Sequence, residues 1–194
     1  AGRIDRFLAI AARHGIRPML VIFDSCWNPV PKAGPQPAPR PHVHNSGWLQ
    51  SPGTDALKDP ARRAALKPYV QDILRRFGRD NRVLCWDLFN EVNNRNGGRF
   101  PEHDVPEKPR WAIDLMHRTF EWAREVAPSQ PLTVCVWDGD WSDDDKLAPW
   151  QRFVLENSDV VSFHRYGDLE TTRRNVGELK RFGRPMLCTE YMAR

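Results

Sequence analysis

The 194-residue chain lacks an apolar run of the roughly 18 residues that a membrane-spanning helix needs, which excludes a membrane-embedded protein. No apolar h-region of the kind that a secretory signal needs follows the charges of its first six residues, so we do not expect these residues to form such a signal. The basic residues are scattered among acids and the net charge is only +4, so the sequence has no basic stripe for nucleic acid. What remains is a globular composition, 40% hydrophobic and 28% charged.

Cysteine is scarce, and its spacing excludes two further classes of site. The chain has four cysteines and no Cys-x-x-Cys pair, which fits neither a zinc site nor a small disulfide-stabilised protein. Each cysteine lies in or beside an apolar, strand-like run, and we therefore expect buried free thiols. The four positions are Cys26, Cys85, Cys135 and Cys188.

Apolar periodicity alternates between helix and strand along the whole sequence. The helical spacing predicts helices at about 4–11, 60–77, 109–126, 146–156 and 169–182. Continuous apolar runs predict strands at 18–23, 83–88, 132–137, 160–163 and 185–188. Gly15 and Gly78 are predicted to end the first two helices. Apolar strands separated by helices indicate a parallel sheet covered on both faces.

Such a sheet is either doubly wound or closed into a barrel. A doubly wound sheet usually has a glycine-rich phosphate loop after an early strand, but the first predicted strand is followed by Asp24-Ser-Cys-Trp-Asn28. Polar and aromatic residues instead cluster after the carboxyl end of each strand, where a (β/α)₈ barrel keeps its active site. We therefore predict an α/β fold, a (β/α)₈ TIM barrel, with residues 1–194 as a single partial domain.

Two glutamates directly follow predicted strands, Glu91 after 83–88 and Glu190 after 185–188. They are 99 residues apart in sequence, close to three βα units of about 33 residues each. Such a spacing fits strands that face one another across a barrel mouth. Glycoside hydrolysis needs two carboxyl groups, one to donate a proton and one to attack or to activate water. The pair therefore predicts a glycosidase.

The ordered strand-end motifs Asn90-Glu91, His164-x-Tyr166 and Glu190 resemble those of the clan A glycoside hydrolases, which are retaining (β/α)₈ enzymes. The rest of the sequence resembles cellulase-like relatives in glycoside hydrolase family 5, often labelled 1,4-β-xylanases. This resemblance covers nearly the whole chain, and its further matching pieces are Phe23-Asp-Ser-Cys-Trp27, His44-Asn-Ser-Gly-Trp48, Trp137-x-Gly-Asp-Trp141 and Cys188-Thr-Glu-Tyr-Met-Ala-Arg194. It implies that about strands three to seven are present, with strands 1, 2 and 8 missing. Because an incomplete barrel has two unpaired sheet edges, we expect the isolated segment to fold poorly.

The resemblance also implies a role for each matching residue. Glu91 would be the acid/base and Glu190 the nucleophile of a double displacement on β-linked oligo- or polysaccharides. The charge of Glu190 would raise the pKa of Glu91 and keep it protonated. Asn90 would hold the sugar 2-hydroxyl, Tyr166 would orient Glu190, and His164 would line the same wall. Many relatives have proline after the acid/base, where this chain has Val92, and that position does no chemistry.

The tryptophans are candidates for stacking against the apolar faces of sugars. Trp27, Trp137 and Trp141 follow strand ends and are predicted subsite platforms, with ordinary packing as the alternative. Trp48 lies in the long proline-rich segment 28–52, which we interpret as a wall of the cleft because long loops in compact domains are often functional.

Two other functions stay open from the sequence. His42-Val-His44 is similar to the His-x-His of metal-dependent hydrolases on the same fold, although here prolines flank it. A barrel that binds glycan without cleaving it is the second alternative. The favoured interpretation is a glycosidase with a carbohydrate substrate, no cofactor, no metal ligands and no nucleic-acid partner. Family resemblance favours a secreted or periplasmic location, while the sugar and the oligomeric state stay undetermined.

Overall fold

The computed structural model describes residues 2–96, 100–103 and 105–191. The chain divides into two compact units, which are described one at a time. Unit 1 comprises residues 1–20, 81–87 and 129–194, and unit 2 comprises residues 21–80 and 88–128. Among the described helices, none combines the length and apolar character that crossing a membrane requires.

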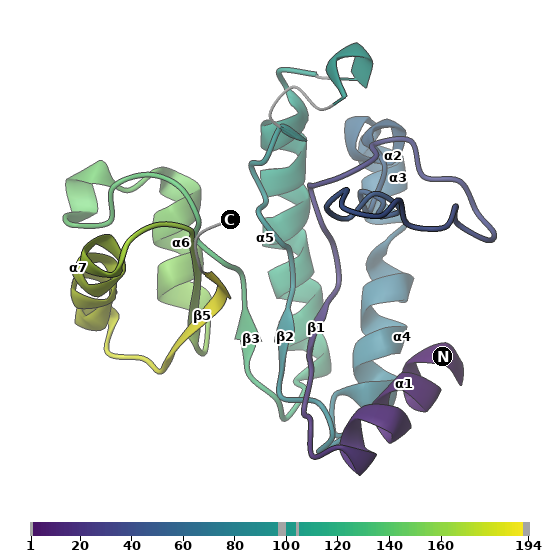
Figure 1. The fold of residues 1–194 in the computed structure, drawn as a ribbon, viewed down its shortest axis with the longest axis horizontal. Helices are drawn as coiled ribbons and strands as arrows, with labels where there is room; N and C mark the ends of the chain where they lie inside the picture. The colour runs from purple at the N-terminus through teal and green to yellow at the C-terminus, as the bar shows by residue number, and fades with distance from the viewer. Residues whose placement is uncertain (1, 97–99, 104, 192–194) are drawn as a thin grey trace. The chain divides into compact units, whose positions relative to one another are not determined.

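Unit 1 is built on parallel strands whose spatial order follows the chain. The strands are β1 (Met19–Val21, of which the first two residues belong to this unit), β2 (Cys85–Asp87), β3 (Leu132–Thr133), β4 (Val161–Arg165) and β5 (Met186–Tyr191) (Figure 1). The sheet order is β1-β2-β3 in one part and β4-β5 in the other.

A bridge beyond β3 joins these two parts. Trp86 of β2 lies opposite Leu132 of β3 in parallel register. Val136 then forms a parallel bridge with Phe163 of β4, in which the Val136 amide donates to the Ser162 carbonyl at 3.1 Å. A doubly wound sheet reverses its strand order at a switch point, whereas this order runs from β1 to β5 without reversal. The topology is therefore consistent with the wall of a barrel.

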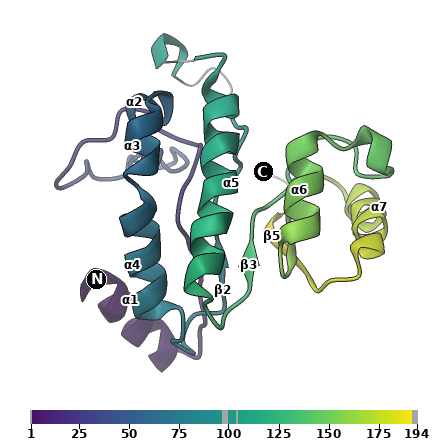
Figure 2. The same cartoon turned by 180° about the vertical axis from the view of Figure 1, so that it is seen from behind.

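The helices of unit 1 are α1 (Gly2–Arg13), α6 (Pro149–Asn157) and α7 (Leu169–Leu179), with short 3₁₀ turns η3 (Asp144–Lys146) and η4 (Lys180–Phe182). Helices α6 and α7 are neighbours in both views (Figures 1 and 2). The predicted end of α1 at Gly15 is confirmed. Gly15 has a φ of +68°, and the Ile16 amide donates to the Ala11 carbonyl at 3.0 Å across it.

Unit 2 contains α2 (Thr54–Lys58), α3 (Pro60–Ala64), α4 (Lys67–Phe77), the 3₁₀ turn η2 (Pro101–His103) and α5 (Lys108–Val126). Helices α4 and α5 lie side by side in both views (Figures 1 and 2). Their apolar faces form the core of the unit, with Val70 and Leu74 of α4 and Leu115 and Met116 of α5 fully buried. A polar seam runs beside this core, since Glu125 accepts hydrogen bonds from Lys67 and Gln71.

The predicted helix 60–77 is wrong as a single element, because two helices occupy this range. Asp59 caps α3 by accepting from the Ala61 amide at 2.8 Å, and the chain then turns at 65–66 before α4 starts. Pro68 accounts for the break. It has no amide hydrogen to donate, and its ring would clash with the Ala64 carbonyl in a continuous helix. The short helix α2 was not predicted.

All four cysteines are free thiols, as the sequence predicts. Cys26, Cys85 and Cys135 are buried, whereas Cys188 on β5 is half-buried. Burial also raises the pKa of the Cys85 thiol to about 11.

Candidate active site

Glu91 follows an extended stretch of unit 2 that pairs with the segment after β1. The Asn90 amide donates to the Phe23 carbonyl at 2.8 Å, and the Ser25 amide donates to the Asn90 carbonyl at 3.2 Å. The backbone then turns sharply, since Glu91 has a φ of +42°. Non-glycine residues seldom adopt this conformation, and it is often found at functional sites.

The Glu91 carboxyl group is buried, with 8% of the residue exposed, and is held by two donors within unit 2. Its Oε2 atom accepts from Asn94 Nδ2 at 2.6 Å and from the Cys26 thiol at 3.1 Å. Burial raises the pKa of Cys26 far above its usual value, and the charges of Asp24 and Glu91 raise it further. Cys26 therefore stays a neutral thiol that donates its hydrogen, rather than a reactive thiolate.

Asp24 and Asn90 form a second layer beside this carboxyl group. Burial raises the pKa of Asp24, while hydrogen bonds from the Cys26 amide and the Asn90 side chain oppose the rise. The Cys26 amide donates to Asp24 Oδ1 at 2.6 Å. The Asn90 side chain, predicted to hold a sugar hydroxyl, thus contacts Asp24 in the structure.

Residues that the sequence analysis did not single out support the turn around Glu91. The Ser25 hydroxyl donates to the Val92 carbonyl at 2.8 Å, and the Lys108 ammonium donates to the Ser25 carbonyl at 2.6 Å. Lys108 is only 2% exposed, so this is a buried contact between α5 and the strand-end loop. Val92 is fully buried. Its position after the acid/base candidate is therefore a packing position.

Glu190 lies on β5 of unit 1, opposite His164 of β4. Phe163 pairs with Cys188, but His164 pairs with Glu190, so Thr189 is an extra residue in β5. This is a β-bulge, a feature that re-aims a side chain and is common beside active sites. In regular register His164 would face Thr189 instead.

Two side chains of unit 1 flank the Glu190 carboxylate, whose side chain is 35% exposed. The Tyr166 hydroxyl donates to Glu190 Oε2. His164 Nε2 lies 3.6 Å from Oε1, and its side chain is 3% exposed. The structure thus brings together three predicted residues, Glu190, Tyr166 and His164. Glu91 and Asn90 belong to the other unit, and that Glu91 and Glu190 face one another stays a prediction.

The four candidate tryptophans have different settings. In unit 2, Trp27 is half-buried and Trp48 is 57% exposed, with their ring centroids 5.8 Å apart in an edge arrangement. In unit 1, Trp137 is half-buried, whereas Trp141 is 1% exposed and packs edge-on against Phe163. Trp141 therefore offers no free ring face in this structure, and we leave it out of the proposed substrate surface.

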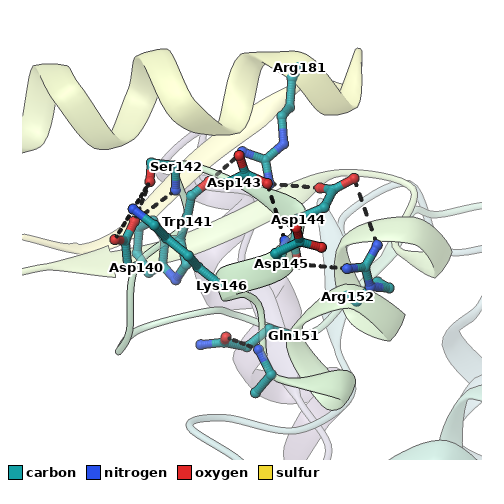
Figure 3. Close-up of polar contacts among 11 residues, drawn as sticks. Asp140, Trp141, Ser142, Asp143, Asp144, Asp145, Lys146, Gln151, Arg152 and Arg181 are labelled. Atoms are coloured by element: carbon teal, nitrogen blue, oxygen red, sulfur yellow. Dashed lines mark hydrogen bonds and ion pairs between the residues drawn. The ribbon is translucent and has the colours of Figure 1, made fainter.

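The loop after β3 is fixed by its own charges, as Figure 3 shows. Lys146 donates to Asp140 at 2.8 Å, which together with donors from Ser142 lowers the pKa of Asp140. Arg181 of η4 donates to the Trp141 carbonyl and pairs with Asp144 at 2.9 Å. The ion pairs of Asp140 and Asp144 thus stabilise the conformation of this loop. His42 and His44, the metal-ligand alternative, lie in turns of unit 2 and outside any strand.

The chain is similar in fold to three solved xylanases, which have the (β/α)₈ barrel of clan A. A family 10 xylanase of Thermobacillus composti has 16% identity and a TM-score of 0.57, with 97% of this chain and 52% of that chain covered. An intracellular xylanase of Thermoanaerobacterium saccharolyticum has 15% identity and a TM-score of 0.58, with 97% and 58% covered. A family 10 endo-β-1,4-xylanase of Gloeophyllum trabeum has 15% identity and a TM-score of 0.56, with 97% and 55% covered. The chain thus spans about half the length of these enzymes.

No curated protein matches the sequence. The profile of the cellulase family, glycosyl hydrolase family 5, matches residues 41–191, which is most of the chain. The resemblance that the strand-end motifs indicated is therefore confirmed, and the chain belongs to glycosyl hydrolase family 5.

Proposed function

We propose that this chain carries both catalytic residues of a retaining glycoside hydrolase that acts on β-linked oligo- or polysaccharides. Glu190 is the nucleophile and Glu91 the acid/base. Membership of family 5 supports the glycosidase class. The observation that carries the assignment of Glu190 is its half-exposed carboxylate on a bulged strand end, hydrogen-bonded by Tyr166.

In the first step Glu190 attacks the anomeric carbon, and the bond from that carbon to the leaving oxygen breaks. Glu91 gives its proton to the leaving oxygen, so the products are a glycosyl-enzyme ester and a free hydroxyl group. The Tyr166 hydroxyl, by holding Oε2 of Glu190, limits rotation of the carboxylate before attack.

In the second step Glu91 takes a proton from water as the water oxygen attacks the anomeric carbon. The ester bond breaks and Glu190 leaves as a carboxylate, so the net reaction is hydrolysis with retained configuration. Asn94 and Cys26 both donate to Oε2 of Glu91. These two donors hold the Glu91 carboxyl group in place for both proton transfers.

The chain forms about strands three to seven of a (β/α)₈ barrel in this proposal, with β1 as the third strand and β5 as the seventh. An unreversed order of parallel strands supports it. A substrate of the xylan or cellulose type is the finer part of the proposal, supported by the family and by the fold of the xylanases. The full-length enzyme is the one that has the complete barrel.

The test uses the full-length enzyme on a panel of aryl β-glycosides and polysaccharides, with the first anomer formed identified by NMR. We expect retention, and a loss of about 10²–10⁴-fold in Glu91→Ala. Glu190→Ala should be inactive. Added azide should give a glycosyl azide of inverted configuration with Glu190→Ala and of retained configuration with Glu91→Ala.

Glu121→Ala, which alters an exposed carboxylate on α5, is the matched control and should keep wild-type activity. An inverted first anomer would refute the double displacement. Full activity in Glu190→Ala would refute the nucleophile, and loss of activity with a chelator would favour the metal-dependent alternative.

A further inference from the structure

The long loop between β1 and α2 in unit 2 (Figure 1) has an unusual charge composition. No acidic residue occurs between Asp24 and Asp55, although the chain has 25 in total. The same stretch contains Lys32, Arg40 and two histidines. The loop is therefore a region of positive potential that has no acidic side chain of its own to balance it.

Part of this loop encloses a pocket of about 200 Å³. Three aromatic side chains, Trp27, Trp48 and Phe100, line it together with Arg40 and Asn45. Trp48 is 57% exposed, so one wall of the pocket is an accessible indole. None of the residues that line the pocket is acidic.

The Arg40 guanidinium is available to a ligand. Its backbone amide donates to the Ser46 hydroxyl at 2.7 Å, which fixes the main chain at this point. Within the described part of the chain, no carboxylate lies in ion-pair range of its guanidinium. Arginines elsewhere are paired, as Arg63 is with Asp114 and Arg181 with Asp144.

The other polar side chains of the pocket are neutral, so the Arg40 guanidinium is the charged group that a ligand in the pocket would meet. The Gln36 amide donates to the Lys32 and Gly34 carbonyls, and Asn28 Oδ1 accepts from the Val30 amide. These side chains hold the shape of the loop. An accessible indole suits the apolar face of a sugar ring, and an unpaired guanidinium suits a carboxylate, which it binds through two parallel hydrogen bonds.

We propose that this pocket is a subsite for a carboxylate-bearing sugar unit, a uronic acid, on the polysaccharide substrate. Arg40 binds the carboxylate and Trp48 stacks on the ring. The inference rests on the proposed function for the polysaccharide, and it adds the acidic character of the substrate. Arg40 determines specificity here and takes no part in bond cleavage.

The test measures binding to full-length enzyme that carries Glu190→Gln, so that no ligand is cleaved. The probes are a β-1,4-xylo-oligosaccharide with one glucuronic acid branch and the same oligosaccharide without it, compared by calorimetry. We expect the acidic probe to bind about tenfold more tightly, and this preference to weaken as salt is added. Arg40→Gln should remove the preference and leave binding of the neutral probe unchanged.

Lys32→Gln is the matched control, since it removes a cation from the same loop but from outside the pocket lining. It should keep the preference, while Trp48→Ala should weaken binding of both probes. Equal binding of the two probes, or a preference that survives Arg40→Gln, would overturn the proposal. Hydrolysis of neutral polysaccharide without any acid preference refutes the subsite alone. Binding of the acidic probe that depends on Arg40, together with no hydrolysis by the full-length enzyme that retains Glu190, would refute the proposed activity alone.

Discussion

Tyr166 directly follows β4, Glu190 lies on β5, and the hydroxyl oxygen of Tyr166 that donates to Glu190 is the one atom that Tyr166→Phe removes. Hydrogen bonds to charged groups contribute about 1.5–3 kcal/mol. We therefore expect Tyr166→Phe in the full-length enzyme to lower kcat by roughly 10–100-fold with little change in KM. Tyr191→Phe, at an exposed position on the same strand, is the control and should keep wild-type kinetics. An unchanged kcat in Tyr166→Phe would remove Tyr166 from the proposed mechanism.

Asp24 should make the stability of the enzyme depend on pH. Its raised pKa means that the folded state binds the proton more tightly than the unfolded state does. The free energy of unfolding then falls as pH rises from about 4, the ordinary value, through the folded-state pKa. Asp24→Asn cannot ionise and lacks this loss, so its stability relative to wild type should increase with pH.

Urea unfolding of both full-length proteins over this pH range measures the difference. Asp72→Asn, at an exposed position on α4, is the control and should follow wild type. If the free energy of unfolding changes with pH in the same way in wild type and Asp24→Asn, the burial of Asp24 does not make stability depend on pH.

The two glutamates could be found from the sequence because each lies at the carboxyl end of a strand or just beyond it, and strand ends meet at one edge of a parallel sheet. Tyr166 and His164 were found through the resemblance to the clan A enzymes. Cys26 and Asn94 were not, although both contact the Glu91 carboxyl group. Their contacts depend on the left-handed turn at Glu91, and a non-glycine residue gives no sequence signal for that conformation.

At the scale of elements, Gly78 ends α4 for a reason other than backbone freedom. Its φ is −70°, which any residue adopts, but a Cβ there would meet the Leu74 carbonyl oxygen and lie 2.8 Å from Pro128 Cβ. We expect Gly78→Ala to cost about 1–3 kcal/mol of stability through overpacking. Thermal unfolding of the full-length enzyme measures the loss.

Gly177→Ala is the matched control, because Gly177 lies within α7 and a Cβ there would have no atom within 4 Å. Alanine should stabilise that helix by roughly 0.5–1 kcal/mol. Equal effects of the two substitutions would show that helix propensity, and not contact with Pro128, decides the result at Gly78.

Among the elements, periodicity predicted the strands and most helices within a few residues. The break at 65–66 was missed although Pro68 signals it. The bulge at Thr189 carries no sequence signal, since the apolar pattern of β5 is the same with or without an extra residue. It is a property of strand pairing.

At the scale of the whole molecule, the proposed barrel requires the sheet to close through further strands. Within the described residues β1 pairs with β2 and β5 with β4, whereas in the proposed barrel each also pairs with a further strand. Unpaired parallel strands expose backbone groups and favour aggregation. We therefore expect the isolated 194-residue chain to unfold without a sharp transition in calorimetry, and the full-length enzyme to unfold cooperatively. A sharp, reversible transition in the isolated chain would count against the proposed barrel.

The sequence by itself determined the alternation of helices and strands, because the apolar period is a local property. Its strand-end motifs also indicated the family and the two glutamates as catalytic candidates. The tertiary structure decided what surrounds those residues. It opposed Glu190 to His164 through a bulge, gave Glu91 a thiol and an amide as donors, and buried Trp141. It also placed Arg40, which has no carboxylate partner among the described residues, in a pocket lined by the exposed Trp48. Several of these contacts join segments that are far apart in the sequence, and local sequence patterns do not show which of those segments pack together.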